Sequence, residues 1–175
     1  VKVFNKKGQP VKKGRGIFAA MFMDRFPLIP VEDDGRLHNP AIRENFIEQI
    51  FTLKRWREAR TKRTCVGNVV EFHTRNKLLL MAYHQTEMRE MGRIVANRNK
   101  RPVTEVLAAY EQHLGSALAR PARCTNHINV LMHALGYFSE GLSGAEKAFF
   151  LESLQRRHTF LMNLASSQQK HQFLQ

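Results

Sequence analysis

From Asn39 onward, apolar residues recur with the three- and four-residue spacing of an α-helix over most of the remaining chain. The first stretch begins with Asn39 and Pro40, which suit a helix cap and a first helical position. Pro102 and Pro121 interrupt the pattern, because proline lacks the N–H that a helix interior requires. Further helices are predicted at about residues 66–83, 86–97, 103–119, 125–139 and 144–165. The spacing therefore predicts a mainly α protein, a bundle of five or six helices.

Two helix starts also carry capping signals. Thr86 can cap the short helix that follows it, and Ser143 with Glu146 has the spacing of a capping box. These positions fix where two of the predicted helices begin.

The first residues follow a different pattern. Residues 1–4 and 28–31 have the apolar character of short buried strands, and residues 17–26 have the spacing of a short helix that Pro27 ends. A βαβ unit needs neighbouring strands, and the rest of the chain supplies none. We therefore predict a βαβ remnant of an α/β domain over residues 1–37, followed by a helical domain over residues 38–175.

Positive charge is concentrated in the first hundred residues. The chain has 28 Lys and Arg against 15 Asp and Glu, a formal charge of +13, and residues 1–101 hold 22 of those cations and 10 of those acids. Such a surface favours polyanions, nucleic acid ahead of acidic lipid, although a basic protein without a specific anionic ligand is the alternative. The densest basic run, residues 54–63, includes Trp56, which could stack on a base or turn into the core.

Several classes of protein are not indicated. No apolar run approaches the roughly 18 residues of a membrane span, and no stretch has the layout of a signal peptide, so we expect a cytoplasmic protein. Cys65 and Cys124 lie far apart, and two cysteines alone cannot hold an iron–sulfur cluster or a structural zinc ion. We therefore expect no metal and no cofactor in this chain.

Polar side chains interrupt the apolar faces of two predicted helices. His73 and Asn76 share a helical stripe with apolar residues, while Asn129, His133 and Tyr137 follow one another at intervals of four. Buried polar groups need partners, so the stripes indicate either a hydrogen-bonded seam between helices or a binding site. A site that contacts RNA through phosphate, 2′-hydroxyl and stacking would use the following cationic, amide and ring side chains: Arg55, Arg57, His73, Arg75, Lys77, Arg123, His127, Asn129, His133 and Tyr137.

The same stripes carry a family resemblance. Residues 71–82, 91–96 and 126–138 resemble the YbgA-like family, long described as a domain of unknown function, which occurs alone or behind a TudS-type domain with the fold of the thiouracil desulfurases. Residues 1–32 resemble the C-terminal end of that TudS-type domain. Residues 156–175 depart from the family pattern, as a truncated or diverged end would.

The resemblance implies a tRNA-binding module that serves an enzyme removing sulfur from thiouridine. The cysteines that hold the iron–sulfur cluster of that enzyme would lie upstream of Val1, so the resemblance assigns no catalysis to this chain.

Three functions are thus open. The leading hypothesis is an RNA-binding module, for tRNA or another structured RNA, that partners a TudS-type desulfurase and is not an enzyme on its own. The second is a cofactor-free enzyme that uses His73 and His133. The third is a protein-interaction domain that docks a separate TudS-type partner.

Overall fold

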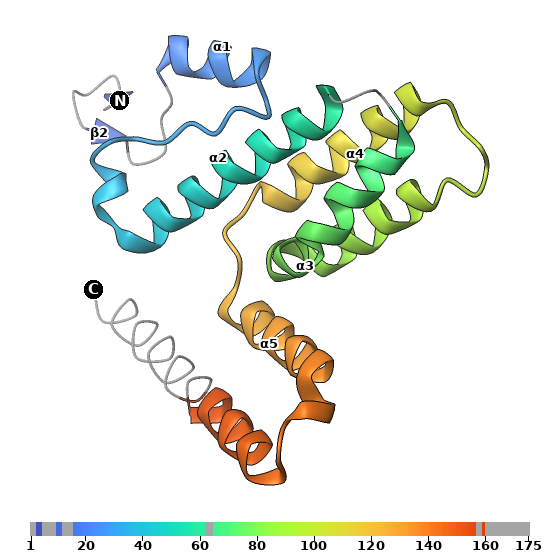
Figure 1. Ribbon diagram of the computed structural model, residues 1–175. Coiled ribbons are helices and arrows are strands. Elements are labelled where there is room, and N and C mark those ends of the chain that lie inside the picture. Colours follow the sequence, from blue (N-terminus) through green and yellow to red (C-terminus); the bar gives the residue numbers. More distant parts are fainter. Residues whose placement is uncertain (1–2, 5–9, 12–15, 62–64, 157–158, 160–175) are drawn as a thin grey trace.

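The computed structural model describes residues 3–4, 10–11, 16–61, 65–156 and 159 of the 175-residue chain (Figure 1). The described part is mainly helical, as the sequence predicts. Its helices are α1 (Ile17–Arg25), α2 (Pro40–Thr61), α3 (Val66–Ala96), α4 (Val103–Leu118) and α5 (Cys124–Phe138), with a further helix over residues 144–156. Short 3-10 turns, η1 (Arg36–His38) and η2 (Ser139–Gly141), precede α2 and follow α5. None of these helices has both the length and the apolar character needed to cross a membrane. Residues 157–158 and 160–165 of the last predicted helix lie outside the described part.

The predicted βαβ unit is wrong. Two-residue strands β1 (Val3–Phe4) and β2 (Pro10–Val11) pair antiparallel and both precede α1. Residues 28–31 form turns and irregular chain instead of a strand. Pro27 precedes this segment and Pro30 lies within it, and a proline cannot donate to a sheet ladder. The segment instead passes beside α4, where Leu28 Cδ2 lies 3.0 Å from the position that a Cβ at Gly115 would occupy.

The core lies among α2, α3 and α4, which stand side by side in Figure 1. Trp56 stacks on Tyr110 with ring centroids 4.8 Å apart and meets the ring of Phe72 edge-on at 5.3 Å. Trp56 is 1% exposed, so it packs inward and does not offer a stacking surface to a base. Burial of each such large side chain stabilises the fold by about 1.5–3 kcal/mol.

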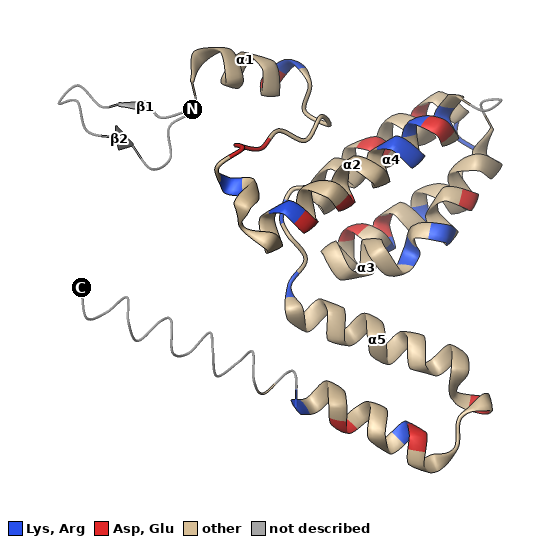
Figure 2. Cartoon of the chain, turned by 60° about the vertical axis from the view of Figure 1, so that its left-hand side comes forward, with Lys and Arg blue, Asp and Glu red and all other residues tan. Residues whose placement is uncertain are grey.

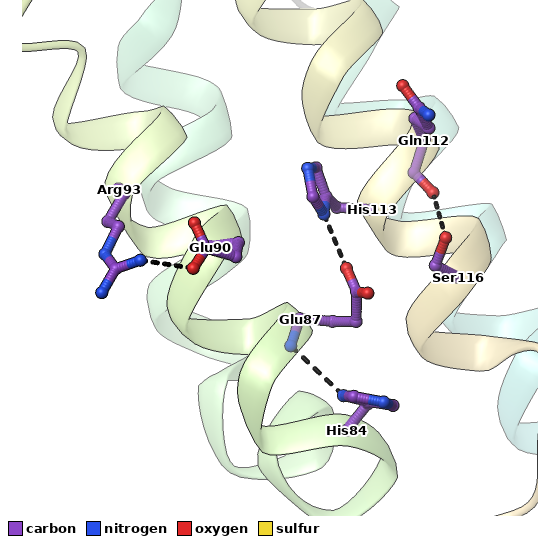
Figure 3. Close-up of polar contacts among 7 residues, drawn as sticks. All are labelled: His84, Glu87, Glu90, Arg93, Gln112, His113 and Ser116. Carbon is purple, nitrogen blue, oxygen red and sulfur yellow. Dashed lines mark hydrogen bonds and ion pairs between the residues drawn. The ribbon is translucent and has the colours of Figure 1, made fainter.

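Helix α3 is broken at His84, whose φ of −156° and ψ of 99° are not helical. The amide of Asn126, at the start of α5, donates to the carbonyl oxygens of Ala82 at 2.9 Å and Tyr83 at 3.4 Å. On the other side of the break, His84 Nδ1 accepts from the Glu87 N–H at 3.3 Å (Figure 3). The predicted cap at Thr86 is therefore wrong, because the imidazole of His84, two residues earlier, caps the Glu87 N–H in the first turn.

The helix over residues 144–156 begins with the predicted capping box. The Ser143 N–H donates to the Glu146 carboxylate at 2.8 Å, and the Glu146 N–H donates to Ser143 Oγ at 3.3 Å.

The C-terminal helices pack less tightly than the core. Helix α5 contacts α3 but has no fully buried residue, and it contains no Lys, Arg, Asp or Glu (Figure 2).

Candidate functional site

A groove of about 810 Å³ runs along α3 and past its C-terminal end, and three of the predicted site residues line it. His73 and Lys77 come from the part of α3 before the break, and His133 comes from α5. The volume lies within the range of small-molecule sites, roughly 300–1,000 Å³. The remaining lining side chains come from α3 and the loop after it: Met81, Gln85, Met88, Arg89, Gly92, Arg93, Ala96, Asn97, Arg98, Asn99 and Arg101.

The groove is strongly cationic. Among the residues that the structure describes, its lining includes Lys77, Arg89, Arg93, Arg98 and Arg101 but no Asp or Glu. Within the described part of the chain, Arg93 is the only one of these five with a carboxylate partner, the Glu90 side chain one turn earlier (Figure 3). Cations that converge without counter-charges attract anions, because a cleft focuses their field.

The loop after α3 holds two of these arginines in a fixed turn. Asn97 ends the helix in the left-handed conformation, with φ of 39°, which is common one residue past a helix. Its side-chain amide donates to the Arg101 carbonyl at 3.0 Å, and its Oδ1 accepts from the Arg101 N–H at 2.9 Å. Both hydrogen bonds close the loop, so Arg98 and Arg101 reach the same groove.

His73 lies at the inner side of the groove. It is 8% exposed, and its Nδ1 lies 3.1 Å from the Tyr110 hydroxyl on α4. Desolvation by burial, followed by the nearby charge of Lys77, lowers the pKa of His73 below its usual value, so the imidazole is neutral at pH 7. Burial raises the pKa of Tyr110, which keeps its hydroxyl proton.

The predicted seam is confirmed for one stripe and wrong for the other. Asn76 is buried beside His73 and donates to the carbonyl of Phe72 at 2.8 Å. The stripe on α5 is not buried, because Asn129 is only partly covered, His133 is exposed and Tyr137 is 70% exposed. Those α5 side chains face solvent, so they do not fix the register of the helices.

The other predicted site residues are dispersed over the molecule. Arg55 and Arg75 line a separate hollow of about 250 Å³, where Arg75 pairs with Glu71 at 2.7 Å. Arg123 lines a third hollow, of about 620 Å³, beside the break in α3. Arg57, His127, Asn129 and Tyr137 line none of these three cavities. The predicted residues thus do not form one continuous face.

Four arginines of the groove were not among the predicted site residues: Arg89, Arg93, Arg98 and Arg101. A signal for two of them is present in the sequence. Residues 98–101 place three cations between two predicted helices and directly before Pro102. Arg89 and Arg93 are four residues apart on one helix face, but assigning that face to the site required the position of α5.

A polar contact between helices supports the second half of α3. His113 Nδ1 on α4 lies 2.6 Å from Glu87 Oε2, as Figure 3 shows, and Glu87 is the residue whose N–H is capped by His84. The contact fixes the part of α3 that carries Arg89, Gly92 and Arg93. Among the described residues, no group of three or more His, Cys, Asp or Glu is placed to bind a metal ion.

Comparison with known proteins places this chain near uncharacterised relatives. The family described as "protein of unknown function (DUF1722)" matches residues 77–173, which include every lining residue of the groove except His73. The uncharacterized protein YbgA of Escherichia coli (strain K12) is 30% identical over 112 residues, which cover 62% of this chain and 66% of that protein, just under two thirds of its length. No solved structure matches.

Proposed function

The chain belongs to the DUF1722 family, in agreement with its resemblance to YbgA-like proteins. We propose that it is an RNA-binding module with tRNA as its first candidate ligand. One observation carries the proposal: the described lining of the groove has five Lys and Arg side chains and no carboxylate. Phosphates supply most of the electrostatic affinity in protein–nucleic acid complexes, and cations that share a cleft are suited to them.

RNA fits the groove better than a simple anion does. Alongside the cations, the lining offers neutral hydrogen-bonding side chains, among them His73, Gln85 and Asn99. RNA presents hydroxyls and base edges next to each phosphate, so charged and neutral side chains can both find partners on it. A free phosphate would use the cations and leave the neutral groups unpaired.

The enzyme hypothesis has less support. His73 and His133 do share the groove, but the described residues of its lining include no Ser, Thr, Cys, Asp or Glu. Nucleophilic catalysis needs a nucleophile within hydrogen-bond reach of its base, and a base is usually oriented by a third group. Tyr110 orients His73, but the described lining offers neither imidazole a nucleophile, which favours binding over catalysis.

A partner domain is the second part of the proposal. Helix α1 leaves Ile17, Phe18 and Met21 more than two-thirds exposed, and the resemblance of residues 1–32 to the end of a TudS-type domain indicates what would cover them. We infer that the module presents thiolated tRNA to such a desulfurase in the cytoplasm. Titration with a purified TudS-type domain, followed by mass measurement in solution, should give a one-to-one complex that Phe18→Asp disrupts; equal complex formation by the variant would refute this docking surface.

Binding to a labelled tRNA pool, titrated in salt, tests the RNA proposal directly. Duplex DNA and unstructured RNA serve as competitors, and a preference for tRNA near physiological salt is expected. Lys77→Gln and Arg98→Gln should each weaken binding and reduce the salt slope by about one. Arg156→Gln is a matched control, because Arg156 is equally charged, 76% exposed and not among the described residues that line the groove. Groove variants that bind like this control would overturn the proposal.

A further inference from the structure

The two ring nitrogens of His73 have different surroundings. Nδ1 lies 3.1 Å from the Tyr110 hydroxyl, and the two rings meet edge to face with centroids 6.0 Å apart. Nε2 has no hydrogen-bond partner among the residues that the structure describes, although the side chain is only 8% exposed. Among the described residues, only the Trp56 Nε1 atom is fully buried without a partner, so the unpartnered Nε2 of His73 is accessible and can form a hydrogen bond with a ligand in the groove.

The hydroxyl of Tyr110 decides which ring nitrogen carries the proton. Tyr110 is fully buried, and His73 is its sole hydrogen-bond partner within the described residues. The hydroxyl proton has an acceptor only if Tyr110 donates to Nδ1, and a neutral imidazole then carries its hydrogen on Nε2. The group that faces the groove is therefore an N–H donor, which calls for an acceptor on the ligand.

Gly92 leaves Nε2 open to the groove. A Cβ at this position would lie 3.4 Å from Nε2 and 3.9 Å from Cε1 of His73. A methyl group there would occupy the space that a ligand oxygen or nitrogen needs at a hydrogen-bond distance of about 2.7–3.2 Å from Nε2. Because Gly92 and His73 both line the groove, a single methyl would block this donor without changing any charge.

We propose that the groove receives one nucleotide unit of the bound RNA, with the Lys and Arg side chains on its phosphate and the His73 Nε2–H donating to an acceptor on its nucleoside. This inference rests on the proposed function and adds a specificity-determining pair, His73 and Gly92. The cations supply affinity for any phosphate, since charge attraction carries no sequence information. The neutral donor, held by Tyr110, distinguishes a nucleoside from phosphate alone.

The first test compares two glycine variants of the whole chain. Gly92→Ala should weaken binding to the tRNA pool at least tenfold while leaving the salt slope unchanged, because no phosphate contact is lost. Gly136→Ala is the matched control, since Gly136 is also helical and has nothing within 4 Å of its Cβ position. Both variants should keep the wild-type circular dichroism spectrum, and neither should lower the thermal midpoint, because alanine favours a helix more than glycine does.

The second test uses the wild-type protein and depends on no variant. The Nε2 resonance of His73, assigned by its loss in His73→Gln, is followed by NMR during titration with the four nucleoside 5′-monophosphates and with inorganic phosphate. We expect the nucleotides to shift this resonance and phosphate to leave it in place. An equal shift with phosphate would overturn the inference, because phosphate would then be the acceptor.

The results of these tests distinguish the nucleoside contact from the proposed RNA binding on which it rests. If Lys77→Gln and Arg98→Gln weaken tRNA binding but Gly92→Ala binds like Gly136→Ala, the groove binds RNA and the nucleoside contact is refuted. If the two charge variants also bind like wild type, the RNA-binding proposal itself fails.

Discussion

Replacing Asn126 by Ala removes the side chain that α5 provides at the break in α3. The Asn126 amide donates to the Ala82 carbonyl at 2.9 Å and lies 3.4 Å from that of Tyr83. In an unbroken helix, the Tyr83 carbonyl would accept from the Glu87 N–H, but that group donates to His84 Nδ1. The variant therefore leaves partly buried carbonyls without the partner that the break requires.

The loss of stability in Asn126→Ala follows from the hydrogen bonds that the variant lacks. One short and one long hydrogen bond are lost, and the acceptors stay in a partly covered place, so we expect a loss of about 1–3 kcal/mol in the free energy of unfolding. At this chain length each kcal/mol lowers the thermal midpoint by about 2–4 °C. Asn126→Asp should be at least as destabilising, because a carboxylate cannot donate and faces two carbonyl oxygens.

Urea unfolding followed by circular dichroism measures the change. Asn129→Ala is the control, since Asn129 lies one turn further along α5 and has no hydrogen bond of its side chain among the described residues. Equal stability of Asn126→Ala and Asn129→Ala would refute the view that this amide caps the break.

Three further results are expected. Because the folded-state pKa of His73 lies below its ordinary 6.5, its neutral form adds stability above that pH, and this contribution is lost as pH falls through the folded value. His73→Phe should therefore flatten that part of a plot of unfolding free energy against pH, and an unchanged plot would contradict this expectation. Trp56 is fully buried, and its Nε1 has no hydrogen bond among the described residues, so Trp56→Phe should destabilise the protein less than Trp56→Ala. Urea unfolding should show that Trp56→Ala lowers the free energy of unfolding by about 3–5 kcal/mol. The Arg60–Glu111 contact at 2.7 Å joins α2 to α4 but is partly exposed, so a double-mutant cycle should give a coupling below about 1 kcal/mol, and a larger value would show that solvent does not screen it.

Helices after Asn39 could be predicted because their signals are local. The Asn39–Pro40 start and the Ser143–Glu146 box depend on neighbouring residues alone, and both are confirmed, the Asn39 Oδ1 accepting from the Ala41 N–H at 3.0 Å. A strand is different, because its stability comes from a partner that the local sequence does not specify. Residues 28–31 are apolar enough for a strand, yet they follow Pro27, include Pro30 and pass beside α4 instead.

The break in α3 shows a second limit of local patterns. The sequence indicated two helices, at about residues 66–83 and 86–97, and the geometry does change at His84. What the spacing could not indicate is that the two halves stay connected and that Asn126, more than forty residues later, satisfies the carbonyls between them. The groove depends on this long-range contact, because Arg89 and Arg93 belong to the second half and His73 and Lys77 to the first.

The buried polar stripe of α3 had two explanations, a seam that orders the helices or a site, and His73 supports both. Its Nδ1 meets Tyr110 across the α3–α4 contact, which is the role of a seam. Its Nε2 faces Gly92 and the cationic groove, which is the place of a ligand contact. The structural bond serves the ligand contact as well, because a ring held by Tyr110 in one orientation and one tautomer presents its remaining N–H without further loss of side-chain freedom. A histidine on the open surface, such as His133, would have to give up that freedom on binding.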